Sequence, residues 1–145
     1  MTRPRLVPFK AEHMLEFVNR DTLALAEWKF AIEKERGGPA FTAIIDDVIL
    51  GCAGVMLVWP GVGVAWLAAS KSMNKHTIWM TRLTRMALTD VMRSFHLHRV
   101  EAVVLTSNEH NLRWIELLGF KREKNVARAY TQDRRSVVRF ERINR

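Results

Sequence analysis

The segment from Val62 to Thr106 constrains the fold of this chain more than any other. It begins with a strand-like stretch, "VGVAWLAAS", and continues through the polar "KSMNKH" into a long helical pattern, "TIWMTRLTRMALTDVMRSF". It ends in a second strand-like stretch, "RVEAVVLT". In the helical part, Met80, Ala87 and Val91 recur at the spacing of one helix face. A strand, a helix and a strand in this order predict a crossover connection within one sheet.

The segments on either side of this crossover complete the expected architecture. Strand-like "AFTAIID" and "VILGCAGVMLVW" meet at Asp46-Asp47, and "PGVG" turns the chain into the next strand. A short strand, "LVPF", and two helices, "KAEHMLEFVNR" and "DTLALAEWKFAIEKER", come before them, and the strands "ARAYT" and "SVVRFERI" close the chain. We therefore expect one α+β domain over residues 1–145, with the order β-α-α-β-β-β-α-β-α-β-β. Its mixed sheet would have six to seven strands flanked by about four helices.

Composition limits the class of protein further. The 145 residues suit a single domain, and the formal net charge of +8 favours anionic partners such as phosphate groups. The longest apolar run is interrupted by Pro60 and by glycines, so no membrane partner is expected. The N-terminus has no signal-peptide core, and a single cysteine favours a reducing compartment, so we expect a cytoplasmic protein.

A second strand-to-helix junction, "TSNEHNLRWIELLGF", carries two asparagines three residues apart. Asn108 is a good helix N-cap, and Gly119 follows the last apolar residue as a usual helix stop. Helix capping explains the asparagine at position 111, the third helical residue, less well than it explains Asn108. Asn108, Asn111 and position 115 fall on one helix face, which leaves this face available to line a site.

The order of elements and two local patterns resemble the GNAT superfamily of acetyl-CoA-dependent N-acyltransferases. The first pattern is the strand, polar loop and long helix of "VAWLAASKSMNKHTIWMTRL". The second is Asn108, then Asn111, then Leu118-Gly119-Phe120. The turn "WPGVGVAW" is similar to phage-encoded members of this superfamily, and a phage protein would act in the host cytoplasm. The resemblance covers nearly the whole chain and implies acetyl-CoA as the cofactor.

The resemblance also implies which residues contact the cofactor. The strand ending at Ala69 would bond the pantetheine arm through its backbone, and the loop after it would bind the pyrophosphate where the next helix begins. Asn108 and Asn111 would add amide hydrogen bonds. The implied cofactor-binding residues are Leu67, Ala68, Ala69, Asn74, Lys75, His76, Thr77, Asn108 and Asn111.

Two departures from the family's pattern bear on catalysis. The phosphate loop "SKSMNKHT" contains no glycine, although glycine lets a backbone approach a phosphate closely. The position where many members carry a tyrosine acid is Ile115. The catalytic residues are therefore unknown, with Tyr130, the only tyrosine, as the one candidate acid. Glu101 is a candidate base or a salt-bridged residue, and Cys52 is a core residue by its apolar surroundings.

The leading hypothesis is an N-acetyltransferase that moves an acetyl group from acetyl-CoA to an unidentified primary amine by direct attack in a ternary complex. The alternative is a GNAT-fold protein with weak or no activity that binds nucleic acid or serves in phage assembly; the glycine-free loop, Ile115 and the basic composition motivate it. No residues have metal-ligand spacing, and a homodimer is a further option within the superfamily.

Overall fold

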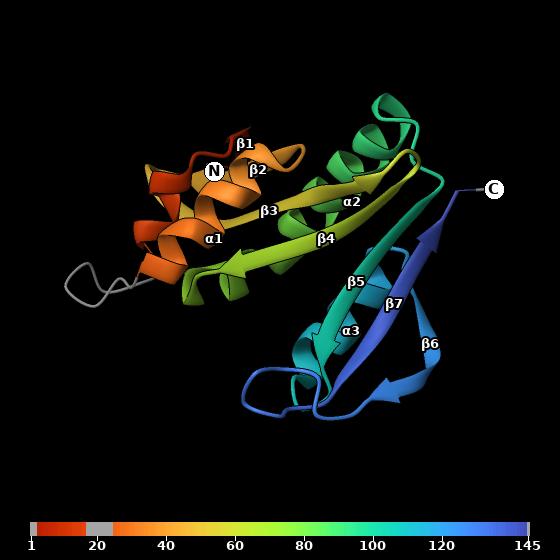
Figure 1. Cartoon of the computed structure of the whole chain (residues 1–145). Helices are drawn as coiled ribbons and strands as arrows, with labels where there is room; N and C mark the ends of the chain where they lie inside the picture. The colour runs from red at the N-terminus through yellow and green to blue at the C-terminus, as the bar shows by residue number, and fades with distance from the viewer. Residues whose placement is uncertain (1–2, 17–24, 145) are drawn as a thin grey trace. The chain divides into compact units, whose positions relative to one another are not determined.

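The computed structural model describes residues 3–16 and 25–144. Its α-helices and strands follow one another as β1 (Arg5–Pro8), α1 (Leu25–Arg36), β2 (Ala40–Ile45), β3 (Val48–Trp59), β4 (Val62–Ala69), α2 (Thr77–Ser94), β5 (Arg99–Leu105), α3 (Glu109–Leu117), β6 (Lys121–Ala127) and β7 (Val137–Ile143). Two 3-10 helices, η1 (Ala11–Glu16) and η3 (Lys71–His76), add to these (Figure 1). The expected α+β class and the seven-stranded mixed sheet are confirmed.

The strands are ordered β1-β2-β3-β4-β5-β7-β6 in the sheet. Contacts divide the chain into two compact units, an N-terminal unit of Met1–Leu57 with Trp66–Leu83 and a C-terminal unit of Val58–Ala65 with Thr84–Arg145. The expectation of a single domain stays a prediction. No helix in the described residues is long and apolar enough to cross a membrane.

The N-terminal unit contains the antiparallel β1–β2–β3 sheet. The turn at Asp46-Asp47 has φ values of 47° and 64°, which is the left-handed geometry of the tight hairpin turn that the sequence predicted. At the centre of this unit Leu50, Thr42 and Cys52 are almost completely buried. The first predicted helix is a 3-10 helix over Ala11–Glu16, and the rest of that prediction lies outside the described residues.

The C-terminal unit is built on β5. This strand pairs in parallel with β4 only over Val62–Val64, opposite Arg99–Glu101, and pairs with β7 along its full length. Helix α3 contacts β5, and β6 forms the outer edge beside β7 (Figure 1). Phe140, Val138 and Val100 are fully buried at the centre of this unit.

The last hairpin begins earlier than the sequence indicated. We expected its first strand at "ARAYT", but β6 spans Lys121–Ala127, and Tyr130 lies in the connection to β7. Six of the seven β6 side chains are exposed, because β6 is an edge strand and little covers it. A strand that is exposed on both faces lacks the alternation of apolar and polar residues that reveals a strand.

The Pro60-Gly61 turn is fixed to the residues before β5. Gly61 has φ +87°, and its carbonyl accepts hydrogen bonds from the N–H groups of His98 (2.8 Å) and Arg99 (3.1 Å). A Cβ at position 61 would lie 2.3 Å from the His98 ring. Proline at the second turn position and glycine with positive φ at the third form a type II turn, and His98 closes over it.

We predict that Gly61→Ala lowers the free energy of unfolding by about 2–4 kcal/mol. Roughly 1–2 kcal/mol comes from the left-handed backbone and a similar amount from the clash with His98. Urea unfolding of Gly61→Ala and of Gly61→Ala/His98→Ala separates the two causes. The double variant should recover the part due to the clash, and equal losses in both variants would contradict this explanation.

Candidate functional site

The second half of β4 and the helix after it form the best candidate site. Leu67 and Ala69 are exposed and Ala68 is half-buried, while the pairing of β4 with β5 is confined to Val62–Val64. Leu67–Ala69 therefore lies outside that ladder. A strand segment outside a ladder can offer backbone N–H and C=O groups to an extended ligand that contains amides.

Gly51 and Met73 hold the segment after β4 in place. The Ser70 hydroxyl and the Ser70 N–H both donate to the Leu50 carbonyl at 2.9 Å, which ends β4 against β3. A Cβ at Gly51 would lie 3.0 Å from the Ala68 carbonyl oxygen and 3.3 Å from the Met73 sulfur. Met73 is buried, so the small residue at 51 lets η3 pack closely on the strands.

The polar segment "KSMNKH", expected as an irregular loop, is the 3-10 helix η3 and runs directly into α2. A 3-10 helix bonds N–H groups to carbonyls three residues back, so much of the backbone donor capacity before Thr77 is already used. The Thr77 hydroxyl also donates to the Asn74 carbonyl at 3.0 Å. Asn74 and Lys75 are exposed and His76 is half-buried. An anion here would be bound largely by side chains.

A chain of polar contacts in the N-terminal unit links His13 of η1, Thr42 of β2 and Cys52 of β3. His13 Nδ1 accepts the Lys10 N–H at 3.2 Å and lies 2.7 Å from the Thr42 hydroxyl, which therefore donates to it. Thr42 Oγ1 is also 3.5 Å from Cys52 Sγ. Burial raises the pKa of the Cys52 thiol to about 11, against a smaller opposing effect of Thr42. Cys52 is therefore a protonated core residue and not a nucleophile.

Trp66 packs against Phe9 at the start of the candidate segment. The two rings meet edge to face with their centroids 5.1 Å apart, and Phe9 contacts His13 in the same way at 6.2 Å. Phe9 is buried and its N–H donates to the Ala40 carbonyl at 3.0 Å. This packing fixes the direction in which β4 continues toward Leu67.

In the C-terminal unit, helix α3 has the start and stop that the sequence predicted. The Asn108 side chain accepts the Asn111 N–H at 3.0 Å, which is an N-cap bond to the third helical residue. At the other end Gly119 has φ +95°, and the Phe120 N–H donates to the Ile115 carbonyl at 3.4 Å. Together with the bond from the Gly119 N–H to the Glu116 carbonyl, this forms a Schellman motif.

The Schellman motif also gives Ile115 a structural role. Ile115 and Phe120 occupy the two positions that usually make a hydrophobic contact in this motif, and both are buried. No hydroxyl is available at position 115. Tyr130 is 61% exposed in the β6–β7 connection, where its N–H donates to the Arg135 carbonyl at 2.9 Å. Its role as an acid stays a prediction.

Glu101 belongs to an ion-pair network and is not a free base. The Arg99 guanidinium binds Glu101 at 2.9 Å, Glu123 at 2.8 Å and also Glu141. Burial opposes the charge of Arg99, but these hydrogen bonds raise its pKa above the ordinary arginine value. The hydrogen bond from Arg139, and then that from Arg99, lowers the pKa of Glu123. This interpretation agrees with the salt-bridged alternative for Glu101.

The candidate residues therefore fall into two groups. The N-terminal unit contains the seven from Leu67 to Thr77, and the C-terminal unit contains Asn108, Asn111 and Tyr130.

Sequence reasoning missed Gly51 and Met73, whose contact supports the site; a glycine inside a strand pattern was the available signal. Within the described residues no group of His, Cys, Asp and Glu side chains could hold a metal ion.

The fold is that of GNAT acetyltransferases. An acetyltransferase from Bacillus subtilis solved in complex with CoA superposes with a TM-score of 0.71 at 15% identity, covering 100% of both chains. A GNAT-family acetyltransferase from Bacillus anthracis gives 0.73 at 14% identity, covering 99% of this chain and 98% of the other. A mutant form of the spermidine/spermine N-acetyltransferase SpeG from Vibrio cholerae gives 0.72 at 12% identity, over 97% and 95%.

These likenesses are structural, and at such identities they show the fold alone. No protein-family model and no curated protein matches the chain. The solved structures named above come from bacteria and lend no support to a phage origin.

We predict that Asn108→Ala lowers the free energy of unfolding by about 1 kcal/mol, because the N-cap bond to Asn111 is lost. Asn108→Ser should stay within a few tenths of a kcal/mol of the wild type, since serine also caps helices well. Urea unfolding of both variants measures this difference. If alanine and serine behave alike, Asn108 does not cap α3 in solution.

Proposed function

We propose that this protein is an N-acetyltransferase that transfers an acetyl group from acetyl-CoA to a primary amine. The observation that carries the proposal is the exposed end of β4, Leu67–Ala69, which lies outside the β4–β5 ladder and leads directly into the basic segment at Lys75-His76. An exposed strand backbone suits the two amides of a pantetheine arm, and a basic helix start suits a pyrophosphate. The GNAT fold, and the CoA bound to the Bacillus subtilis protein of the same fold, support the same cofactor.

Each part of this segment has a distinct role in binding the cofactor. Backbone groups of Leu67, Ala68 and Ala69 bond the pantetheine arm as an added strand would. Lys75 and His76, with Asn74, bind the pyrophosphate with side chains, which compensates for the absence of glycine in this segment. Thr77 joins them when its hydroxyl turns from the Asn74 carbonyl to the phosphate. That Asn108 and Asn111 add amide hydrogen bonds, as the family resemblance implies, stays a separate prediction, which Asn111→Ala tests below.

The chemistry needs few groups from the protein. The neutral amine attacks the thioester carbonyl, a C–N bond forms, and a backbone N–H of Leu67–Ala69 stabilises the oxyanion. The C–S bond then breaks, CoA leaves as a thiolate, and water carries away the proton of the amine. The thiol of cysteine has an ordinary pKa of about 8.5, far below that of an alcohol, so a thiolate is a good leaving group and leaves without obligatory protonation. Ile115 in place of tyrosine therefore slows the reaction without preventing it, and positioning supplies most of the rate.

We predict that the purified protein binds acetyl-CoA with micromolar affinity and that Lys75→Ala/His76→Ala weakens binding at least about tenfold. Hydrogen bonds to charged groups contribute roughly 1.5–3 kcal/mol each, which corresponds to that factor or more. Asn111→Ala should also weaken binding. Isothermal titration calorimetry measures all three affinities.

The matched control is Lys124→Ala/Arg134→Ala, which removes two exposed cations from the C-terminal unit and should leave acetyl-CoA binding unchanged. If the control loses as much affinity as Lys75→Ala/His76→Ala, net charge and not the segment determines binding. Absence of binding at millimolar acetyl-CoA would rule out the enzyme and leave a binding protein on a GNAT fold.

A further inference from the structure

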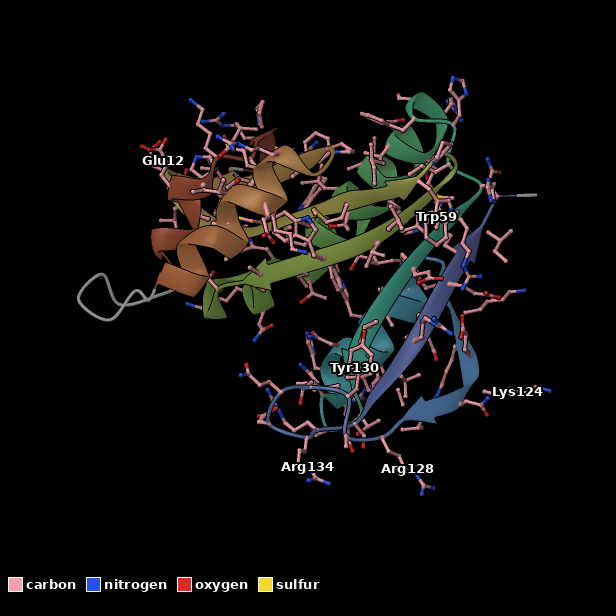
Figure 2. All side chains as sticks on the ribbon, viewed as in Figure 1. Glu12, Trp59, Lys124, Arg128, Tyr130 and Arg134 are labelled. Atoms are coloured by element: carbon pink, nitrogen blue, oxygen red, sulfur yellow. The ribbon has the colours of Figure 1, made fainter. Side chains whose placement is uncertain are left out.

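The β6 strand and its connection to β7 concentrate positive charge. Residues 121–135 contain six Lys and Arg side chains and two carboxylates, a net charge of six minus two, or +4. This is half of the net charge of +8 in fifteen of the 145 residues. Figure 2 shows Lys124, Arg128 and Arg134 pointing outward from this hairpin.

Both carboxylates in this stretch are already paired with arginines. Glu123 binds Arg99 at 2.8 Å and Arg139 at 2.9 Å, and Asp133 binds Arg135 at 2.7 Å. Of the six cations in residues 121–135, five are exposed and have no carboxylate partner among the residues that the structure describes. We refer to these five as the basic hairpin: Lys121, Arg122, Lys124, Arg128 and Arg134.

Protection of a sheet edge does not account for so many charges. Edge strands are commonly protected against pairing with other chains by a bulge or by charged side chains, but Arg128 and Arg134 lie beyond the end of β6. β6 already has an irregularity in register between Arg122 and Val126, which interrupts its pairing with β7. Five unneutralised cations repel one another, so a bound anion would stabilise this arrangement.

The connection after β6 is also held in a defined conformation. The Thr131 hydroxyl donates to Asp133 and accepts the Arg135 N–H at 2.8 Å, and the Arg134 N–H donates to the Thr131 carbonyl at 2.9 Å. Ala129 and Arg134 adopt positive φ values of 50° and 65°. Such values cost energy for residues other than glycine, so they persist only where surrounding contacts hold the backbone. The loop presents Tyr130 with 61% of its surface exposed, and in the sequence this residue lies between Arg128 and Arg134.

We propose that the basic hairpin binds the phosphate backbone of single-stranded nucleic acid, with a base stacked on the Tyr130 ring. Cations that follow a strand edge neutralise successive phosphates, and an exposed aromatic ring stacks on any base. A duplex keeps its bases stacked on one another, so it would leave Tyr130 without a role. An exposed ring in the same connection as two of the cations therefore favours a single strand, and this activity is separate from the acetyl transfer proposed above.

Fluorescence anisotropy with a labelled oligothymidine tests the proposal. A length of about 20 nucleotides exceeds the roughly 4–16 that a small single-strand-binding fold covers. At about 50 mM salt the wild type should bind, and Lys124→Ala/Arg134→Ala should bind about tenfold more weakly. The slope of log affinity against log salt should fall by about 1.4, from roughly 0.7 for each of two lost phosphate contacts. Tyr130→Ala should lose about fivefold or more, whereas Tyr130→Phe should retain affinity.

Arg5→Ala/Arg93→Ala is the matched control, since both residues are exposed and lie outside the basic hairpin. This control should bind oligothymidine like the wild type, and both cation variants, Lys124→Ala/Arg134→Ala and Arg5→Ala/Arg93→Ala, should keep acetyl-CoA binding and thermal stability. Equal losses in the control and in Lys124→Ala/Arg134→Ala would overturn the proposal in favour of a net-charge effect. No binding by the wild type would overturn it too. If a duplex binds more tightly than oligothymidine and Tyr130→Ala has no effect, the surface binds double-stranded nucleic acid. If polyglutamate binds with the same salt dependence as oligothymidine, the surface binds acidic chains in general.

Discussion

Three parallel residue pairs, Val62–Val64 with Arg99–Glu101, are the constraint on which the rest of this structure depends. A parallel pair needs a crossover, and α2 supplies it between the two strands. The pairs are set at one end by the Gly61 turn, whose carbonyl accepts the N–H groups of His98 and Arg99. Because the ladder is short, β4 continues beyond it as an exposed strand segment, and that continuation is the candidate site.

Because the short ladder leaves a strand segment exposed, the proposed site can use backbone groups and needs few specialised side chains. The proposed cofactor contacts come first from backbone groups of Leu67–Ala69 and only then from side chains such as Lys75. Chemical groups with conspicuous sequence signatures have other functions in the structure: Glu101 balances Arg99, and Cys52 is buried beside Thr42. A site made of backbone leaves little trace in residue types, so the element order indicated it better than any single motif.

Several features could be read from the sequence because local chemistry determines them. The Asp46-Asp47 turn, the Asn108 cap and the Gly119 stop each follow from the conformational preferences of one or two residues. Edge strand β6 could not be read from the sequence, because its exposed residues have no periodicity. The close packing of Met73 on Gly51 could not be read either, because it is a tertiary contact. The 3-10 helix over Lys71–His76 was hidden for the same reason, because burial of Met73 holds it and its own sequence is polar.

The most direct test of this account is amide hydrogen exchange, residue by residue, with and without saturating CoA. If the pantetheine arm pairs with the end of β4, exchange at amides within Leu67–Ala69 should slow on addition of CoA, while exchange in β6 at Lys124–Val126 should not change. Unchanged exchange at Leu67–Ala69 under saturating CoA would contradict the central claim, because the cofactor would then bind without using the strand segment that the short ladder leaves exposed.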